Sequence, residues 1–133
     1  MLVIGASSEK EICRIAASSD GSVNACGRLS IMETASALKR VSVLVTNDSA
    51  PLHIAEAVGT PVVALFGPTV RQFGYYPLLD ESMVLEKDLE CRPCSRNGAR
   101  PCHIENRDCL DTIDTDEVLS AISQVLESSG GEG

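Results

Sequence analysis

The sequence predicts an α/β fold in which helices flank a parallel β-sheet. Two nearly continuous apolar runs, residues 41–45 and 62–66, are typical of parallel strands that are covered on both faces. A helical pattern lies between them, so strand, helix and strand alternate along the chain. This alternation favours right-handed βαβ crossovers and a parallel sheet.

Other elements follow from local patterns and helix-end signals. Ser30 and Glu33 form a capping box at a helix start, and Pro51 suits the first turn of another helix. Further strands are expected at residues 2–4 and 23–26. The expected helices span residues 9–20, 30–40, 51–58 and 114–126.

The composition indicates a globular protein and argues against nucleic-acid binding. Hydrophobic residues make up 44% of the chain and aromatic residues only 3%, so the core must be aliphatic. The net charge of -8 argues against a nucleic-acid binder, whose affinity comes mainly from Lys and Arg on phosphates. No apolar run approaches the ~20 residues that span a bilayer, and the apolar opening lacks the basic leader of a signal peptide. We therefore expect a cytoplasmic protein whose cysteines are reduced or metal-bound.

A polar turn, Thr46–Pro51, joins the strand at 41–45 to the next helix. Ligands of open α/β sheets bind at this edge, where the amides of a helix N-terminus attract phosphate. Asp48 or Ser49 can cap the helix, and His53 can donate to a phosphate or a sugar hydroxyl. The alternative is that Asp48 and Ser49 only cap the helix and His53 only packs.

Four cysteines lie in a loop-rich segment, residues 86–112. Cys91-x-x-Cys94 has the spacing of a structural zinc site, whereas Cys102 and Cys109 are separated by six residues. The four thiols either bind a structural zinc ion or remain reduced thiols of the loop. Nearby arginines either steer an anionic ligand or form a solvated surface: Arg92, Arg96, Arg100 and Arg107.

The run NDSAPLHIAEAVGTPVVALFGPT, residues 47–69, resembles the signature of the bacterial ADP-heptose:lipopolysaccharide heptosyltransferases, glycosyltransferase family 9. It joins an unusual polar turn to a downstream Gly-Pro-Thr, and the resemblance extends over about residues 2–126. It implies the Rossmann-like C-terminal half of a GT-B fold, here incomplete. Residues 1–127 would form this nucleotide-sugar-binding domain, with the Cys-rich loop 86–112 inside it and a disordered tail at 128–133.

The resemblance also implies which residues bind the donor. Glu9 matches an acidic residue that binds the ribose, and Leu29 matches a position that borders the adenine. A loop that closes the site corresponds to Gly67, Pro68 and Thr69. The motif that contacts the diphosphate and the sugar corresponds to Asp48, Ser49, Ala50 and His53. Ala50 stands where the family usually has Gly, which would cost about 1 kcal/mol if that position needs a positive φ.

The implied function is donor binding for heptose transfer from ADP-heptose to the lipopolysaccharide inner core, with inversion and with no required cofactor or metal. No catalytic residue is expected in this chain, because the family's base belongs to an N-terminal acceptor-binding domain that the sequence lacks. The chain alone would then be inactive. The expected partners are the nucleotide sugar and, through that domain, the core acceptor at the inner face of the bacterial inner membrane. Open sheet edges make self-association plausible.

Three alternatives stay open at this point. The chain could be the donor domain of another GT-B glycosyltransferase with a different nucleotide sugar, because a helix terminus recognises phosphate better than it recognises sugar. It could instead be a non-catalytic nucleotide- or metal-binding module with a metal-stabilised loop. A truncated reading frame without a separate role is the third alternative.

Overall fold

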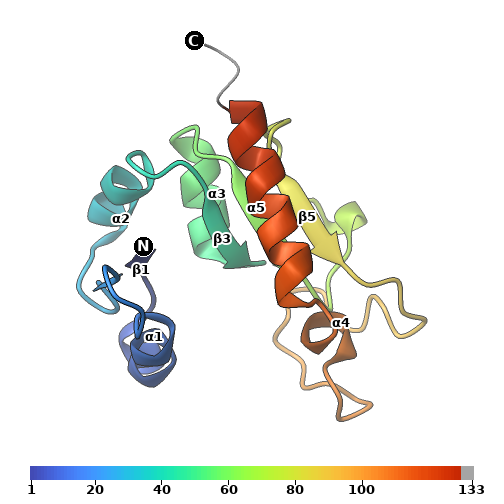
Figure 1. Ribbon diagram of the computed structural model, residues 1–133. Helices are drawn as coiled ribbons and strands as arrows, with labels where there is room; N and C mark the ends of the chain where they lie inside the picture. The colour runs from blue at the N-terminus through green and yellow to red at the C-terminus, as the bar shows by residue number, and fades with distance from the viewer. Residues whose placement is uncertain (130–133) are drawn as a thin grey trace. The chain divides into compact units, whose positions relative to one another are not determined.

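The computed structural model describes residues 1–129, and its residue contacts group into two compact units, Met1–Ala37 and Leu38–Gly133 (Figure 1). The predicted fold class is confirmed, because both units contain parallel strands accompanied by helices. The prediction of one nucleotide-sugar-binding domain over residues 1–127 stays a prediction. Among the helices within residues 1–129, none is long and apolar enough to cross a lipid bilayer.

The first unit holds a two-stranded parallel sheet of β1 (Leu2–Val3) and β2 (Val23–Asn24). The 3₁₀ turn η1 (Ser7–Glu9) and helix α1 (Lys10–Ala16) connect the two strands. Helix α2 (Ile31–Leu38) follows β2. Both strands and both α-helices fall within segments for which the sequence predicts the same type of structure, although the observed elements are shorter, whereas η1 begins two residues before the predicted helix at 9–20.

The predicted capping box at the start of α2 is confirmed. The Glu33 N–H donates to the Ser30 hydroxyl at 3.3 Å, and a Glu33 carboxylate oxygen accepts the Ser30 N–H at 2.8 Å. These two bonds satisfy amides that have no partner inside the helix, which explains why the helix begins at this position.

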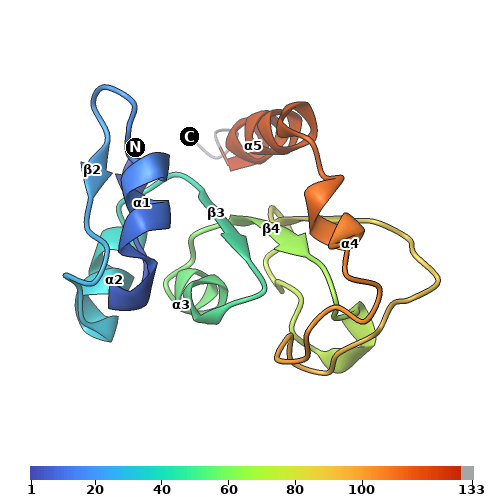
Figure 2. The same ribbon diagram turned by 90° about the horizontal axis from the view of Figure 1, so that it is seen from below.

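The second unit holds a three-stranded parallel sheet in the order β3-β4-β5. The strands are β3 (Leu44–Asn47), β4 (Val62–Phe66) and β5 (Met83–Glu86). Helix α3 (Ala50–Ala57) crosses from β3 to β4, and α5 (Thr115–Ser129) covers β4 and β5. Figure 2 shows α3 and α5 on opposite faces of the sheet. The short elements η2 and α4 span Arg71–Phe73 and Asp108–Asp111.

The central strand β4 explains the continuous apolar run in the sequence. Val63 packs against Ala121 and Val125 of α5 on one face of the sheet. Successive side chains of a strand point to opposite faces, so Val62 and Ala64 face the side covered by α3. All three β4 side chains are buried, as a strand with a helix on each face requires.

The structure corrects several predicted boundaries. The strand expected at 41–45 lies at 44–47, and β5 and α4 fall where no strand or helix was expected. The predicted tail at 128–133 begins too early, because α5 continues through Ser129. The hydroxyls of Ser128 and Ser129 donate to carbonyls four residues earlier, at 2.9 and 2.8 Å. Residues 130–133 lie outside the described residues.

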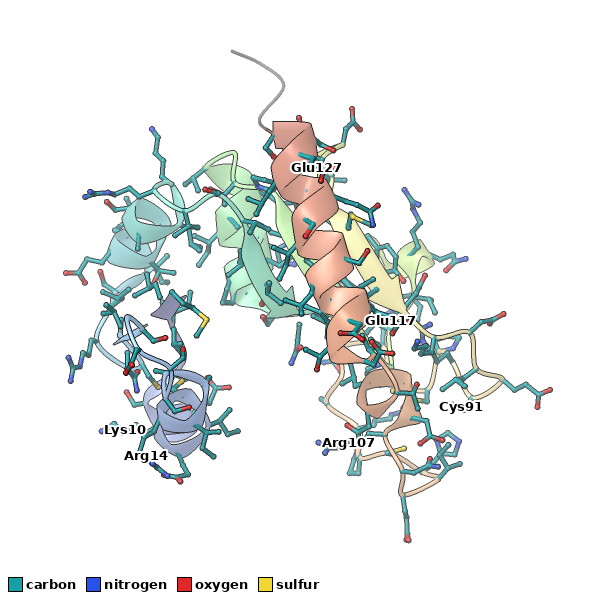
Figure 3. All side chains as sticks on the ribbon, viewed as in Figure 1. Lys10, Arg14, Cys91, Arg107, Glu117 and Glu127 are labelled. Atoms are coloured by element: carbon teal, nitrogen blue, oxygen red, sulfur yellow. The ribbon has the colours of Figure 1, made fainter. Side chains whose placement is uncertain are left out.

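The start of α5 is fixed by a reciprocal pair of hydrogen bonds. The Glu117 N–H donates to the Asp114 carboxylate at 2.9 Å, and the Glu117 carboxylate accepts the Asp114 N–H at 3.0 Å. Figure 3 shows Glu117 at this end of the helix. The predicted start of the helix at Asp114 therefore has a physical cause, since both side chains satisfy amides at its first turn.

A buried hydrogen bond from the Thr60 hydroxyl stabilises the second unit, and a substitution can test its contribution. The Thr60 hydroxyl donates to the Leu38 carbonyl at 2.8 Å, and both residues are buried. Thr60→Val keeps the shape but leaves that carbonyl unpaired, so we expect a loss of about 1–2 kcal/mol in the free energy of unfolding. Urea denaturation followed by circular dichroism measures it. The matched control is Thr112→Val, whose exposed hydroxyl donates to the Asp108 carbonyl and can be replaced by water. Equal losses in the two variants would contradict the prediction.

Candidate functional site

The carboxyl ends of β3 and β4 lie side by side and bring two predicted site segments together. The strands pair in parallel, with Asn47 opposite Leu65, so the turn after β3 and the loop after β4 emerge at the same edge. Across this edge the Thr69 hydroxyl donates to the Asp48 carboxylate at 2.7 Å. Thr69 is only 1% exposed, so the bond is shielded from water. Two residues that are 21 positions apart thus form one site.

The start of α3 differs from the prediction that Asp48 or Ser49 caps the helix. Ser49 is the N-cap residue, but its side chain makes no capping bond. Its hydroxyl donates to the Asn47 carbonyl at 3.2 Å and lies 3.1 Å from the Thr46 hydroxyl, while Asp48 accepts from Thr69. The prediction is wrong because the Ser49 hydroxyl bonds within the turn and the Asp48 carboxylate accepts from Thr69 in the loop after β4. The amides at the start of α3 therefore receive no side-chain cap from Ser49.

Ala50 fits its position without backbone strain. It begins α3, and Glu105 is the one non-glycine residue of the described chain with a positive φ. The cost expected for an alanine in place of the family's glycine therefore does not arise here. Ala50 and His53 are both exposed on α3, where they are accessible to a ligand.

A cavity of about 260 Å³ lies at this edge. Asn47 and Asp48 line it from β3 and its turn, and Gly67 and Pro68 line it from the loop after β4. The Cys-rich loop supplies the opposite part of the lining: Cys94, Gly98, Arg100, Cys102, Arg107 and Cys109. Figure 3 shows Arg107 on this loop, next to α4. Of the predicted donor-binding residues, the cavity thus brings Asp48, Gly67 and Pro68 together.

Gly67 is required by the close approach of α4. A Cβ atom at this position would lie 2.9 Å from Leu110 Cγ and 3.2 Å from Cys109 Sγ. Both distances are shorter than ordinary van der Waals contacts, so any side chain would push α4 away from the loop. The glycine of the Gly-Pro-Thr sequence therefore keeps the cavity wall in place.

The Arg92 side chain stabilises the same loop through hydrogen bonds to its backbone. Its guanidinium donates to the carbonyls of Gly67, Thr69 and Lys87, and it pairs with the Glu86 carboxylate at 2.6 Å. The Arg92 side chain is only 6% exposed. Arg92 is therefore neither a solvated residue nor free to steer a ligand, because its donors are occupied by the loop after β4 and by the end of β5.

A buried tyrosine completes this network. The Tyr76 hydroxyl donates to the Glu86 carboxylate, and the Tyr76 ring lies 4.2 Å from the Phe66 ring, centroid to centroid. Burial and the contact with Glu86 raise the pKa of Tyr76 to about 12. Burial alone would raise the pKa of Glu86, but the hydrogen bonds from Tyr76 and Arg92 and the charge of Arg92 outweigh it and leave that pKa below its usual value.

Residues 1–104 match the family described as glycosyltransferase family 9 (heptosyltransferase). The chain belongs to glycosyltransferase family 9. It is 24% identical over 106 residues to lipooligosaccharide heptosyltransferase 2 of Campylobacter jejuni, which covers 80% of this chain and 32% of that protein. It is 38% identical over 63 residues to lipooligosaccharide heptosyltransferase 2 of Haemophilus influenzae, which covers 47% of this chain and 18% of the relative.

The family 9 fold is also found in a solved structure. The crystal structure of the glycosyl transferase family 9 from Veillonella parvula superimposes with a TM-score of 0.76 and 25% sequence identity. The match covers 96% of this chain and 36% of that one. The chain therefore spans about a third of the length of these proteins or less.

Glu9 and Leu29, the predicted adenosine-binding residues of this family 9 chain, belong to the first unit. Glu9 ends η1, and its carboxylate accepts the Ala6 N–H at 2.7 Å. Leu29 is half-buried between β2 and α2. Their roles in binding the nucleotide stay predictions.

The four loop cysteines of this family 9 chain lie near one another. Burial raises the pKa of the Cys109 thiol, and the neighbouring thiols of Cys94, Cys91 and Cys102 raise it further. Within residues 1–129, no group of three or more His, Cys, Asp or Glu side chains is arranged to hold a metal ion. The zinc site stays a prediction from the cysteine spacing.

Asn47, Arg100 and Arg107 were not among the predicted donor-binding residues, although they line the cavity. The signals in the sequence were the position of Asn47 in the polar turn Thr46–Pro51 and the position of both arginines near the cysteines. Arg107 has a weak partner in Asp111, 3.7 Å away, and both side chains are more than half exposed. Its guanidinium can therefore turn toward an anion in the cavity.

Arg92→Met tests whether this side chain holds the loop. The substitution removes the donor of the Gly67, Thr69 and Lys87 carbonyls. It also removes the charged partner of Glu86, which is 39% exposed and still accepts from the Tyr76 hydroxyl. We expect the free energy of unfolding to fall by about 2–4 kcal/mol in urea denaturation. The control is Arg14→Met, because Arg14 pairs with Glu11 on the exposed surface of α1 (Figure 3). The control should leave the midpoint nearly unchanged; a similar shift in both variants would refute a special role for Arg92.

The Glu86 carboxylate predicts a specific pH dependence. Its pKa is lower in the folded chain than in the unfolded chain, so its contribution to stability is present above about pH 4.3, the usual value for Glu. That contribution is lost as the pH falls through the folded pKa. The difference in unfolding free energy between the wild type and Glu86→Gln should therefore shrink as the pH falls from 6 to 3, a range set by that usual value. A difference that is constant over this range would show that the Glu86 charge does not contribute to the free energy of unfolding.

Proposed function

We propose that this chain binds the nucleotide-sugar donor, ADP-heptose, of a family 9 heptosyltransferase that extends the lipopolysaccharide inner core. The observation that carries the proposal is the Thr69–Asp48 hydrogen bond, which joins the two motif segments beside a cavity at the carboxyl edge of the sheet. Open α/β sheets bind their ligands at this edge. Membership of the family supports the choice of a nucleotide heptose.

The backbone at the start of α3 would bind the diphosphate. α3 is eight residues long, and Ser49 does not cap it with its side chain. Of the first three residues of α3, Pro51 has no N–H and the Leu52 N–H donates to the Ser49 carbonyl at 3.1 Å. The Ala50 N–H, at the positive end of the helix dipole, would therefore bind a phosphate oxygen. Ala50 leaves room for a close approach, and His53 stands exposed three residues further on.

Asp48 would bind the sugar rather than the phosphates. A carboxylate repels a diphosphate, and one Asp48 oxygen already accepts from Thr69. The other oxygen is a suitable acceptor for a sugar hydroxyl. Arg107, in the same cavity lining, would offset the negative charge of the leaving diphosphate.

The transfer itself would need groups outside this chain. Inversion requires a base that takes the proton from the acceptor hydroxyl as it attacks the anomeric carbon, while ADP leaves. The family's resemblance implies that this base lies in an acceptor-binding domain, and the chain spans about a third of its relatives or less. The relatives are named lipooligosaccharide heptosyltransferases, which supports a lipooligosaccharide acceptor. The location that we propose for this transfer is the cytoplasmic side of the inner membrane.

Titration of the full chain with ADP, followed by amide NMR, tests the proposal. ADP should shift the signals of residues 47–53. The substitution His53→Ala should lower the affinity for ADP by roughly 10-fold, the effect of losing one charge-assisted hydrogen bond. His103→Ala, in the Cys-rich loop, is the matched control and should bind ADP like the wild type. UDP and GDP serve as competitors. Stronger binding of UDP would overturn the choice of ADP, and unmoved signals at 47–53 would overturn the site.

A further inference from the structure

Two buried cysteines of the first unit lie beside the turn that follows β1. Cys13 belongs to α1 and Cys26 follows β2, and the two residues are only 4% and 7% exposed. Both are free thiols. A Cβ atom built on Gly5 would lie 2.7 Å from Cys13 Sγ and 3.5 Å from Cys26 Sγ. The two sulfur atoms therefore converge over Gly5, close enough to share a hydrogen bond.

Backbone hydrogen bonds hold Cys26 in this place. The N–H groups of its neighbours, Ala25 and Gly27, donate to the Val3 and Gly5 carbonyls, each at 2.8 Å. These bonds continue the pairing of β2 with β1 and keep the Cys26 thiol next to the turn. A disulfide forms without strain only where the backbone already brings the two sulfur atoms together. The two thiols meet this condition.

The two thiols also lie next to Glu9, the residue predicted to bind the ribose. Glu9 Oε2 would lie 3.1 Å from the Cβ atom built on Gly5, and the Glu9 carboxylate accepts the Ala6 N–H at 2.7 Å. The Ala6 carbonyl accepts from the Cys26 thiol at 3.0 Å. Ala6 is thus hydrogen-bonded to Glu9 through its N–H and to Cys26 through its carbonyl. A chemical change at Cys26 therefore reaches Glu9 through a single residue.

A small oxidant can reach these thiols when α1 opens locally. Cys13 is the one buried side chain of α1, whereas Ile12 and Ile15 are 70% and 60% exposed. A helix of seven residues that buries a single side chain opens at a low cost in free energy. Each opening exposes the sulfur atoms to a diffusing peroxide.

We propose that Cys13 and Cys26 are a redox modification site: a peroxide oxidises the two thiols to a disulfide, and the disulfide lowers the affinity of the chain for ADP. The disulfide takes away the Cys26 S–H that donates to the Ala6 carbonyl, so Ala6 and the bonded Glu9 carboxylate shift from their positions in the reduced chain. The effect on ADP rests on the proposed function, because it assumes that Glu9 contacts the nucleotide. The modification itself requires only the two thiols and the oxidant.

The oxidation proceeds in two steps. In the first, the Cys26 thiolate attacks one oxygen of hydrogen peroxide and the O–O bond breaks. Cys26 becomes a sulfenic acid, and the released hydroxide takes up the proton that Cys26 lost. In the second step the Cys13 sulfur attacks the Cys26 sulfur, the S–O bond breaks, and the hydroxyl group leaves as water with the Cys13 proton. The two thiols lose two electrons, and the peroxide is reduced to two molecules of water.

The order in which the thiols react follows from their surroundings. The hydrogen bond with Cys26 and burial raise the pKa of Cys13 to about 11, with a smaller contribution from the Glu9 charge. Cys13 therefore keeps its proton, and Cys26 is the thiol that attacks the peroxide. A dithiol reductant reverses the modification by thiol–disulfide exchange, as expected for a disulfide in the cytoplasm that we propose for this chain.

Peptide mapping of the full chain after treatment with hydrogen peroxide tests the modification site. Free thiols are blocked with iodoacetamide, and the chain is digested with trypsin in the absence of a reductant. Trypsin cleaves after Lys10, Arg14 and Arg28, so the disulfide should join peptide 11–14 to peptide 15–28 with the loss of two hydrogen atoms. Dithiothreitol should separate the two peptides. Unlinked peptides at a peroxide concentration that oxidises the loop cysteines would overturn the modification site.

ADP titrations of the reduced and the oxidised chain test the effect on binding. The oxidised wild type should bind ADP at least ~10-fold more weakly, the effect of losing a hydrogen bond to a charged group. Cys26→Ser keeps a donor for the Ala6 carbonyl but cannot form the disulfide, so peroxide should leave its affinity for ADP unchanged. Cys91→Ser, in the Cys-rich loop, is the matched control and should lose affinity on oxidation like the wild type. Circular dichroism checks that each variant is folded.

The outcomes distinguish this inference from the proposed function. If the linked peptides form but ADP binds equally to the reduced and the oxidised wild type, the effect on binding is wrong and the donor site stands. If Cys26→Ser loses as much affinity on oxidation as the wild type, the loss arises elsewhere and the effect of this disulfide is wrong. If ADP binds to neither form, the donor site is wrong, and the linked peptides alone decide the modification site.

Discussion

The buried guanidinium of Arg92 is the constraint on which the candidate site depends. It occupies three backbone carbonyls and one carboxylate, and it joins the loop after β4 to the end of β5. Arg92 thereby fixes the loop, while Gly67 lets α4 pack closely against it. Thr69 can then reach Asp48 across the edge of the sheet. A backbone loop held at several points needs little reorganisation when a ligand binds, which favours affinity.

The candidate site also gathers positively charged groups at one edge of an acidic chain. The chain is acidic overall, and a diphosphate would be repelled by most of its surface. At the carboxyl edge, Asp48 is engaged by a hydroxyl, the α3 amides are uncapped by a side chain, and arginines of the Cys-rich loop line the opposite part of the cavity. Positive charge is thus concentrated where an anion would bind. The loop that brings those arginines to the edge is the segment with the least regular secondary structure, as is usual for binding residues.

The sequence predicted those parts of the fold that depend on local pattern. β4 was predicted to the residue, because its apolar run is bounded by Pro61 and Gly67. β3 was predicted too close to the N-terminus, at 41–45 instead of 44–47, because its limits follow from pairing with β4 and not from its own apolar residues. β5 was missed for the same reason: its four residues become a strand only through their bonds to β4. The Thr69–Asp48 and Arg92–Glu86 contacts cannot be predicted from spacing, because they depend on how the loops fold over the sheet.

Arg92 and Arg100 illustrate why residue type alone does not identify a binding residue. Both lie near cysteines in the same loop, so the sequence predicts anion binding equally for the two residues. Arg92 is buried, and its N–H donors bond to three backbone carbonyls. Its charge is neutralised by Glu86, and the side chain therefore stabilises the loop. Arg100 is exposed, and its backbone N–H donates to the Ser95 hydroxyl, so its side chain stays available to the cavity at the carboxyl edge of the sheet. The same residue type is thus buried and bonded to the loop at position 92 but exposed beside a cavity at position 100, and the difference arises from how the backbone of the Cys-rich loop folds.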